Sequence, residues 1–133
     1  ALVSDEAQIP EEHYRLLSLV ARSETGEKPF AQVVIATENN EQQAESEGSG
    51  PVDAAFRAIE KILDSQAELQ LFSVNNITSG TDALGEVTVR LQKSGRIVNG
   101  HGADIDIIAA SAKAYLNACN KLHSSLERTH PQV

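Results

Sequence analysis

The stretch GSGPVDA at residues 48–54 marks the point where a run of short strands gives way to a helix. Proline suits the first turn of a helix, because the first N–H groups of a helix have no partner within it. Apolar residues then follow Pro51 at helical spacing. They are Ala54, Ala55, Ala58, Ile59, Ile62 and Leu63. This pattern predicts a helix from Pro51 to about Ser65.

Three strands are predicted before this helix. Residues 14–22 (YRLLSLVAR) and 30–37 (FAQVVIAT) are short and rich in apolar or β-branched residues, with turn residues at 25–29 and 38–40 between strands. Residues 41–47 (EQQAESE) form a weaker candidate, polar enough to lie at the edge of a sheet. The first half of the chain therefore reads β-β-β-α.

The second half repeats this plan, because GHGADID at residues 100–106 resembles the first junction. Strands are predicted at 69–77, 86–92 and 96–99, with a loop at 78–82, and a helix at 104–126. Residues 86–92 (EVTVRLQ) alternate apolar and polar side chains, as a half-buried strand does. We expect an α+β fold of two pseudo-symmetric β-β-β-α units, 13–66 and 67–127, with antiparallel sheets and the helices packed on one side.

Composition excludes several classes of function. The chain has 133 residues, enough for one domain, and a net charge of −8, which disfavours nucleic acid and anionic membrane surfaces. No apolar run reaches the roughly 20 residues of a membrane-spanning helix. A single cysteine is typical of a cytoplasmic protein. The sequence has no methionine, so either processing has removed an initiator or the chain is a piece of a longer protein. We expect the second, with residues 1–12 as the end of a linker and 128–133 as a tail.

The two Gly-x-Gly junctions are the best candidates for a ligand site. Glycine lets a ligand approach the backbone closely, and a helix N-terminus offers N–H groups to a carboxylate or phosphate. The alternative is a tight turn and nothing more. Asp53, Asp104 and Asp106 are expected in the first turns of the helices, where they complement the helix dipole. Asp53 has the alternative role of binding an ammonium group.

Catalytic and metal-binding patterns are not apparent in the sequence. The histidines, at positions 13, 101, 123 and 130, have no metal-ligand spacing, and we predict no metal site and no cofactor in this chain. Cys119 and Tyr115 lie on the apolar side of the second helix and are expected in the core. Glu38, Glu41, Glu45 and Glu47 are expected to be solvated. We predict no catalytic residue, and the residues indicate a small acidic binding or assembly module.

Three stretches resemble a known family. They are residues 48–54, residues 73–87 (SVNNITSGTDALGEV) and residues 98–118 (VNGHGADIDIIAASAKAYLNA). Together they resemble the C-terminal regulatory domain of the 2-isopropylmalate synthases over about residues 14–122. The resemblance implies an acyltransferase whose upstream barrel, with a divalent metal, condenses acetyl-CoA with 2-oxoisovalerate in leucine biosynthesis. It implies a homodimeric domain that binds L-leucine for feedback inhibition and has no catalytic centre of its own.

The resemblance also implies a leucine site near the dimer interface. Its glycine-loop residues are Gly48, Ser49, Gly50, Pro51, Val52 and Asp53, and its hairpin residues are Thr81, Asp82, Ala83 and Gly85. Leu69 and Phe72 match apolar wall positions, as does Asn76, which is polar here. A second loop that closes the site or its pseudo-symmetric twin is matched by Gly100, His101, Gly102, Ala103 and Asp104. Two alternatives remain: an isoleucine-sensing domain of a citramalate synthase, and a dimerisation module without ligand binding.

Overall fold

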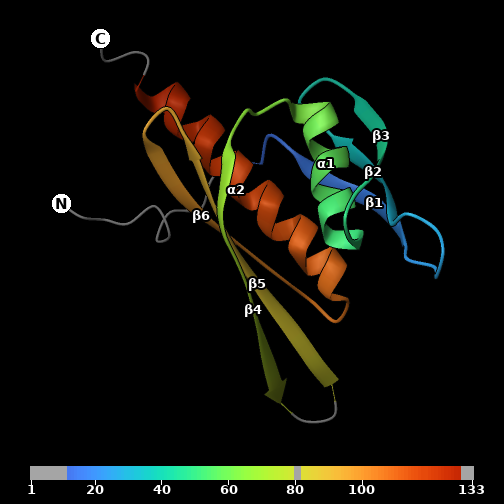
Figure 1. Ribbon diagram of the computed structural model, residues 1–133. Helices are drawn as coiled ribbons and strands as arrows, with labels where there is room; N and C mark the ends of the chain where they lie inside the picture. The colour runs from blue at the N-terminus through green and yellow to red at the C-terminus, as the bar shows by residue number, and fades with distance from the viewer. Residues whose placement is uncertain (1–11, 80–81, 130–133) are drawn as a thin grey trace.

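The computed structural model describes residues 12–79 and 82–129, and for residues 76–79, 82–83 and 125–129 it describes the backbone alone. In chain order its elements are β1 (Arg15–Arg22), β2 (Phe30–Ala36), β3 (Glu41–Glu47), α1 (Pro51–Leu63), β4 (Glu68–Ser79), β5 (Asp82–Lys93), β6 (Arg96–Asp104) and α2 (Ile107–Thr129). The strands form two antiparallel sheets, β1-β2-β3 and β4-β5-β6, each followed by a helix (Figure 1). The predicted α+β fold of two β-β-β-α units is confirmed. Neither described helix is both long and apolar enough to cross a membrane.

The first sheet buries one face beneath α1. On β2, Ala31, Val33 and Ile35 are fully buried, as the period of two in a half-buried strand requires. β3 pairs with β2 along its whole length and is mostly exposed, which confirms the polar edge strand. α1 packs against all three strands of this sheet.

α1 begins and ends where its local chemistry dictates. Pro51 occupies the first turn, directly after the extended residue Gly50. Asp64 adopts the left-handed conformation (φ 47°, ψ 49°) and its N–H group donates to the Glu60 carbonyl, which ends the helix at Leu63. The helix is therefore two residues shorter than the pattern predicts.

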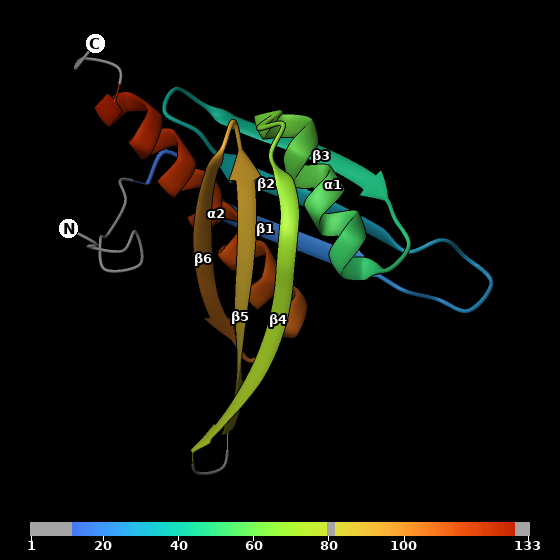
Figure 2. The same ribbon diagram turned by 60° about the vertical axis from the view of Figure 1, so that its left-hand side comes forward.

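The second sheet packs against α2 on one face (Figure 2). Val87, Val89 and Leu91 of β5 are fully buried, which confirms the alternation in residues 86–92. α2 covers β5 and β6 with small side chains such as Ala110, Ala114 and Ala118, and it also contacts α1 and β1. Small residues let a helix lie close to a sheet. Buried residues of both units belong to one apolar cluster, so the two units share one core.

Several boundaries in the second unit differ from prediction. Within the loop predicted at 78–82, the described residues 78, 79 and 82 belong to strands instead, because Thr78 pairs with Ala83 and Ser79 with Asp82. β6 continues to Asp104 instead of ending at residue 99, so the second Gly-x-Gly pair lies in a strand and not in a loop. α2 begins at Ile107 instead of 104 and continues to Thr129 instead of 126. Glycine is uncommon in strands, which is why these residues read as a loop.

The two helix N-termini lie at the same end of the molecule, toward which the β4–β5 hairpin also extends (Figures 1 and 2). Gly85 of β5 pairs with Asp104 of β6 at this end of the second sheet. The fold therefore brings the first glycine loop, the end of β6 and the hairpin to one end.

Candidate ligand-binding site

The first glycine loop is closed by a single carboxylate oxygen. Oδ2 of Asp53 accepts a hydrogen bond from the Ser49 N–H group and another from Nε of Arg57, both at 2.8 Å. The hydrogen bond from the Ser49 backbone, followed by that from Arg57, holds the pKa of the Asp53 carboxyl below its usual value. Asp53 lies in the first turn of α1, as predicted, and its negative charge complements the helix dipole there.

Gly48 and Gly50 serve different purposes in this loop. A Cβ atom on Gly48 would lie 2.6 Å from Oδ2 of Asp53 and would also meet the backbone of Ala54, so only glycine fits. A Cβ atom on Gly50 would meet nothing within 4 Å. The backbone at Gly50, ahead of the N-terminus of α1, therefore faces open space, as an approach for a ligand or a second chain would require.

A hollow of about 450 Å³ lies between α1, the start of β4 and α2. We call it the α1 hollow. Its apolar surface comes from Phe56, Ala67, Leu69 and Tyr115, and its polar rim from Ser46, Asp53, Arg57, Glu60 and Lys61. The rings of Phe56 and Tyr115 lie 4.5 Å apart between centroids, and Phe72 meets Phe56 edge-on at 6.0 Å. The hollow has the size and the mainly apolar lining of a small-molecule site.

Glu60 anchors one wall of the α1 hollow. Its carboxylate accepts hydrogen bonds from the hydroxyl of Tyr115 and from the hydroxyl and N–H group of Ser65, the last two at 2.6 and 2.9 Å. Burial and then the Glu60 hydrogen bond raise the pKa of the Tyr115 phenol far above its usual value. Tyr115 is therefore a neutral hydrogen-bond donor, and it lies in the core, as predicted.

An apolar row on β4 lies uncovered beside this hollow. Leu69, Phe72 and Val74 pair with Leu91, Val89 and Val87, so they point to the same face of the sheet as those buried residues. They nevertheless remain 47%, 38% and 41% exposed, because neither helix lies along β4 in the described part of the chain. We call these three residues the β4 row. A surface of this kind is typical of a contact with another chain.

The second glycine pair serves packing and not a loop. A Cβ atom on Gly100 would collide with the backbone of α2 at Ala114 and Ala118. A Cβ atom on Gly102 would collide with it at Ala110 and Ala114. Gly85 similarly makes room for the side chain of Ile107. The expectation of a glycine loop leading into the helix is therefore wrong: both glycines let β6 lie directly against α2.

The two aspartates near the start of α2 differ in role. Asp104 ends β6 rather than lying in the first turn of the helix, and its Oδ2 binds Nζ of Lys113 at 2.8 Å. The Lys113 hydrogen bond lowers the pKa of the Asp104 carboxyl. Oδ1 of Asp106 accepts from the Ile108 N–H group and so caps α2.

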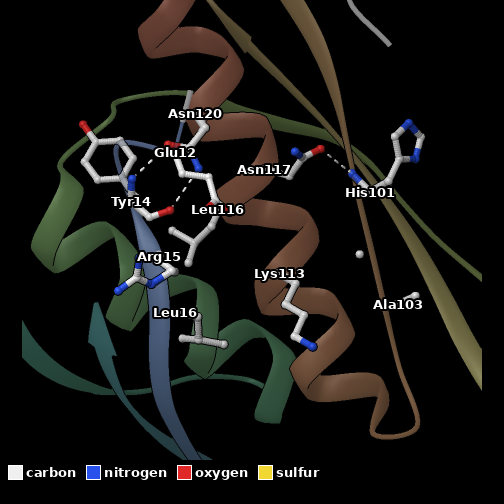
Figure 3. Close-up of a pocket in the computed structure, with 11 residues that line it drawn as sticks. Glu12, Tyr14, Arg15, Leu16, His101, Ala103, Lys113, Leu116, Asn117 and Asn120 are labelled. Atoms are coloured by element: carbon white, nitrogen blue, oxygen red, sulfur yellow. Dashed lines mark hydrogen bonds between the residues drawn. The ribbon is translucent and has the colours of Figure 1, made fainter. Parts of the chain in front are cut away.

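A second hollow, of about 470 Å³, borders α2 between β1 and β6 (Figure 3). His101, Gly102 and Ala103 line it with Arg15 and Lys113, among others. The imidazole of His101 points away from α2 (Figure 3) and lies 3.2 Å from the Thr88 hydroxyl, while the His101 N–H group donates to Asn117. These predicted site residues therefore lie apart from the α1 hollow.

The remaining predicted residues lie on the β4–β5 hairpin. Asn76 and Gly85 pair across the two strands, and Asp82 and Ala83 begin β5. The side chains of Asn76, Asp82 and Ala83, and the whole of Thr81, lie outside the described residues. Pro51 and Val52 open α1 beside Gly50. Of the predicted set, the structure brings Asp53 and Leu69 together in the α1 hollow and places Phe72 beside it.

The thiol of Cys119 lies in the core and is not available as a nucleophile. Cys119 is 3% exposed, and burial, followed by the Glu60 charge, raises the pKa of its thiol well above its usual value. It is therefore a protonated core residue, as predicted.

The chain is similar in sequence to a described domain family and to several named proteins. Residues 1–123 match the family described as the LeuA allosteric (dimerisation) domain. Proteins named 2-isopropylmalate synthase are 94% identical to the chain in Nitrosomonas eutropha, 86% in Nitrosomonas europaea and 74% in Nitrosospira multiformis, each over 133 residues. These matches cover 100% of the chain but 26% of each relative, so the chain spans about a quarter of their length. The chain belongs to the LeuA allosteric (dimerisation) domain family.

Proposed function

We propose that this chain is the feedback-regulatory domain of a 2-isopropylmalate synthase, which pairs with a second copy and binds L-leucine. The observation that carries the proposal is the uncovered β4 row beside the α1 hollow, in a member of a dimerisation-domain family. A second copy seated on the β4 row would remove three apolar side chains from water. It would also close one side of the hollow.

The proposed leucine site combines the first glycine loop with its surroundings. The N-terminus of α1 suits the ligand carboxylate, and Gly50 leaves its approach open. The half-exposed Asp53 suits the ammonium group, and Leu69 and Phe72 suit the isobutyl group. The hairpin residues 81–83 and 85 and the residues 100–104 belong to the proposal through the family resemblance.

The remainder of the polypeptide is part of the same proposal. The relatives are about four times as long as this chain. We place the condensation of acetyl-CoA with 2-oxoisovalerate, and the divalent metal that it needs, in a catalytic barrel elsewhere in the same polypeptide. We place the whole enzyme in the cytoplasm. Residues 1–12 act as the end of the linker, 13–127 as the regulatory domain and 128–133 as the tail. Leucine binding favours one arrangement of this domain. The coupling free energy between the leucine site and the barrel is about 1–3 kcal/mol.

Calorimetry of the 133-residue chain against L-leucine, L-isoleucine and L-valine tests the proposal, with sedimentation to measure the dimer. We expect a dimer that binds leucine in preference to the other two. Preference for isoleucine would assign the chain to a citramalate synthase instead. A folded dimer without affinity for any of the three amino acids would show that the chain is a dimerisation module without ligand binding.

A substitution at Gly50 tests the position of the site. Gly50→Asp places a negative charge in open space at the N-terminus of α1, so it leaves the fold intact and repels the leucine carboxylate. We expect at least a tenfold loss of leucine affinity. The matched control is Asn39→Asp, which adds the same charge in the exposed turn between β2 and β3. Equal affinities of the two variants would contradict the assignment of this loop.

A further inference from the structure

Three metal-ligating side chains from distant parts of the chain meet beside the C-terminal half of α2. His13 precedes β1, Glu38 lies in the turn between β2 and β3, and His123 belongs to α2. Each offers one ligand atom, and these atoms all lie within 4.8 Å of one another. Nδ1 of His13 is 2.9 Å from Oε2 of Glu38, and the imidazole centroids are 3.8 Å apart.

The two histidines are held in place by contacts that do not involve Glu38. Oδ1 of the buried Asn120 accepts hydrogen bonds from the N–H groups of His13 and Tyr14 at 2.8 and 2.9 Å, and its amide donates to the Tyr14 carbonyl. The Tyr14 ring also meets His123 edge-on, with centroids 5.7 Å apart. Asn120 and His123 both lie on α2, so one helix positions both imidazoles.

The donor set is one that zinc binds in proteins. Two imidazole nitrogens and one carboxylate oxygen form a three-ligand zinc site whose fourth position is taken by water. Ligand atoms around a tetrahedral zinc ion lie about 3.4 Å apart. Side-chain rotations that move the present ligand atoms by about 1 Å therefore bring them to the distances that zinc requires. Glu38 is 60% exposed and can make this movement, while His13 is only 5% exposed. The exposed carboxylate also gives an ion a path from solvent.

We propose that His13, Glu38 and His123 bind one divalent transition-metal ion of the zinc type. The ion replaces the hydrogen bond between His13 and Glu38 with bonds to both side chains. It joins the segment before β1, the β2–β3 turn and α2, and so raises the midpoint of thermal unfolding. This proposal does not depend on leucine binding. His123 lies nearer the C-terminal end of α2 than Tyr115, which lines the α1 hollow.

Zinc titration of the full 133-residue chain tests the site, with Co²⁺ as a spectroscopic substitute. We expect one Zn²⁺ per chain, a rise in the unfolding midpoint, and the visible absorption of tetrahedral Co²⁺ without a thiolate band, because Cys119 is buried. Glu38→Gln and His123→Gln should each lower the affinity for zinc at least tenfold. The matched control, Glu41→Gln, removes the same charge from the exposed start of β3 and should bind as the wild type does.

Two outcomes would overturn the site. One is the absence of stoichiometric binding by the folded wild-type chain. The other is undiminished binding by Glu38→Gln, whose exposed side chain can be changed without disturbing the core. Should His123→Gln fail to fold, Glu38→Gln alone still decides the question.

Discussion

At the scale of single residues, a missing side chain decides how close two elements lie. Gly100 of β6 faces the backbone of α2, where a Cβ atom would lie 2.5 Å from the Ala118 N–H nitrogen. It would also meet the backbone oxygen of Ala114. Backbone atoms of a helix cannot move aside without distorting the helix. The close approach of β6 to α2 therefore depends on this glycine.

We expect Gly100→Ala to destabilise the domain by about 2 kcal/mol or more, because the added methyl group overpacks the contact between the strand and the helix. Urea unfolding followed by circular dichroism measures the change. The control Gly50→Ala adds the same methyl group in open space at the start of α1. It should cost no more than about 1 kcal/mol, the range of changes at an N-cap. A similar loss in both variants would show that packing on α2 is not the cause.

At the scale of secondary-structure elements, the start of α1 depends on charge as well as on Pro51. The Asp53 carboxylate receives the Ser49 N–H group and the Arg57 side chain. Its pKa lies below the usual value of 3.8 in the folded chain. The ionised form therefore stabilises the fold at pH values above 3.8, and this contribution is lost as the pH falls through the folded-state pKa.

Asp53→Asn tests this contribution, since asparagine keeps a hydrogen-bond acceptor but loses the charge. We expect the variant to be less stable than the wild type near pH 7, by less than about 1 kcal/mol for so exposed an ion pair. The difference should shrink as the pH falls below 3.8. Unfolding free energies measured across this range check the sign. A difference that stays constant down to low pH would exclude the charge as its source.

At the scale of the whole molecule, the two sheets are covered unequally. α1 packs against every strand of the first sheet, whereas α2 covers β5 and β6 of the second and leaves the β4 row exposed. The apolar face of a sheet is normally buried against another layer. We therefore place the second copy of the chain on the β4 row.

Val74→Lys should convert the dimer to a folded monomer, because it puts a charge into the apolar contact without touching the core. Sedimentation measures the association, and circular dichroism measures the fold. The control Val20→Lys makes the same change on β1, where valine is 40% exposed, compared with 41% at Val74. An undiminished dimer in Val74→Lys, or equal dissociation of both variants, would remove the β4 row from the interface.

Local sequence was sufficient for the elements whose signals lie within a few residues. The alternation of residues 86–92, the proline at the start of α1 and the repeated junctions predicted six strands, two helices and their order. The stretches 48–54, 73–87 and 98–118 indicated the family. These signals work because strand and helix periodicities are set by which side chains must be buried.

Tertiary structure decided what depends on contacts between distant residues. Gly100 and Gly102 read as a loop, since nothing nearby shows that α2 will cover them. The exposure of the β4 row follows from strand register and helix placement, and no local pattern contains either. The cluster of His13, Glu38 and His123 likewise joins residues with no ligand spacing along the chain. The sequence by itself determined the elements and their family, and packing across the two units determined which surfaces and side chains meet.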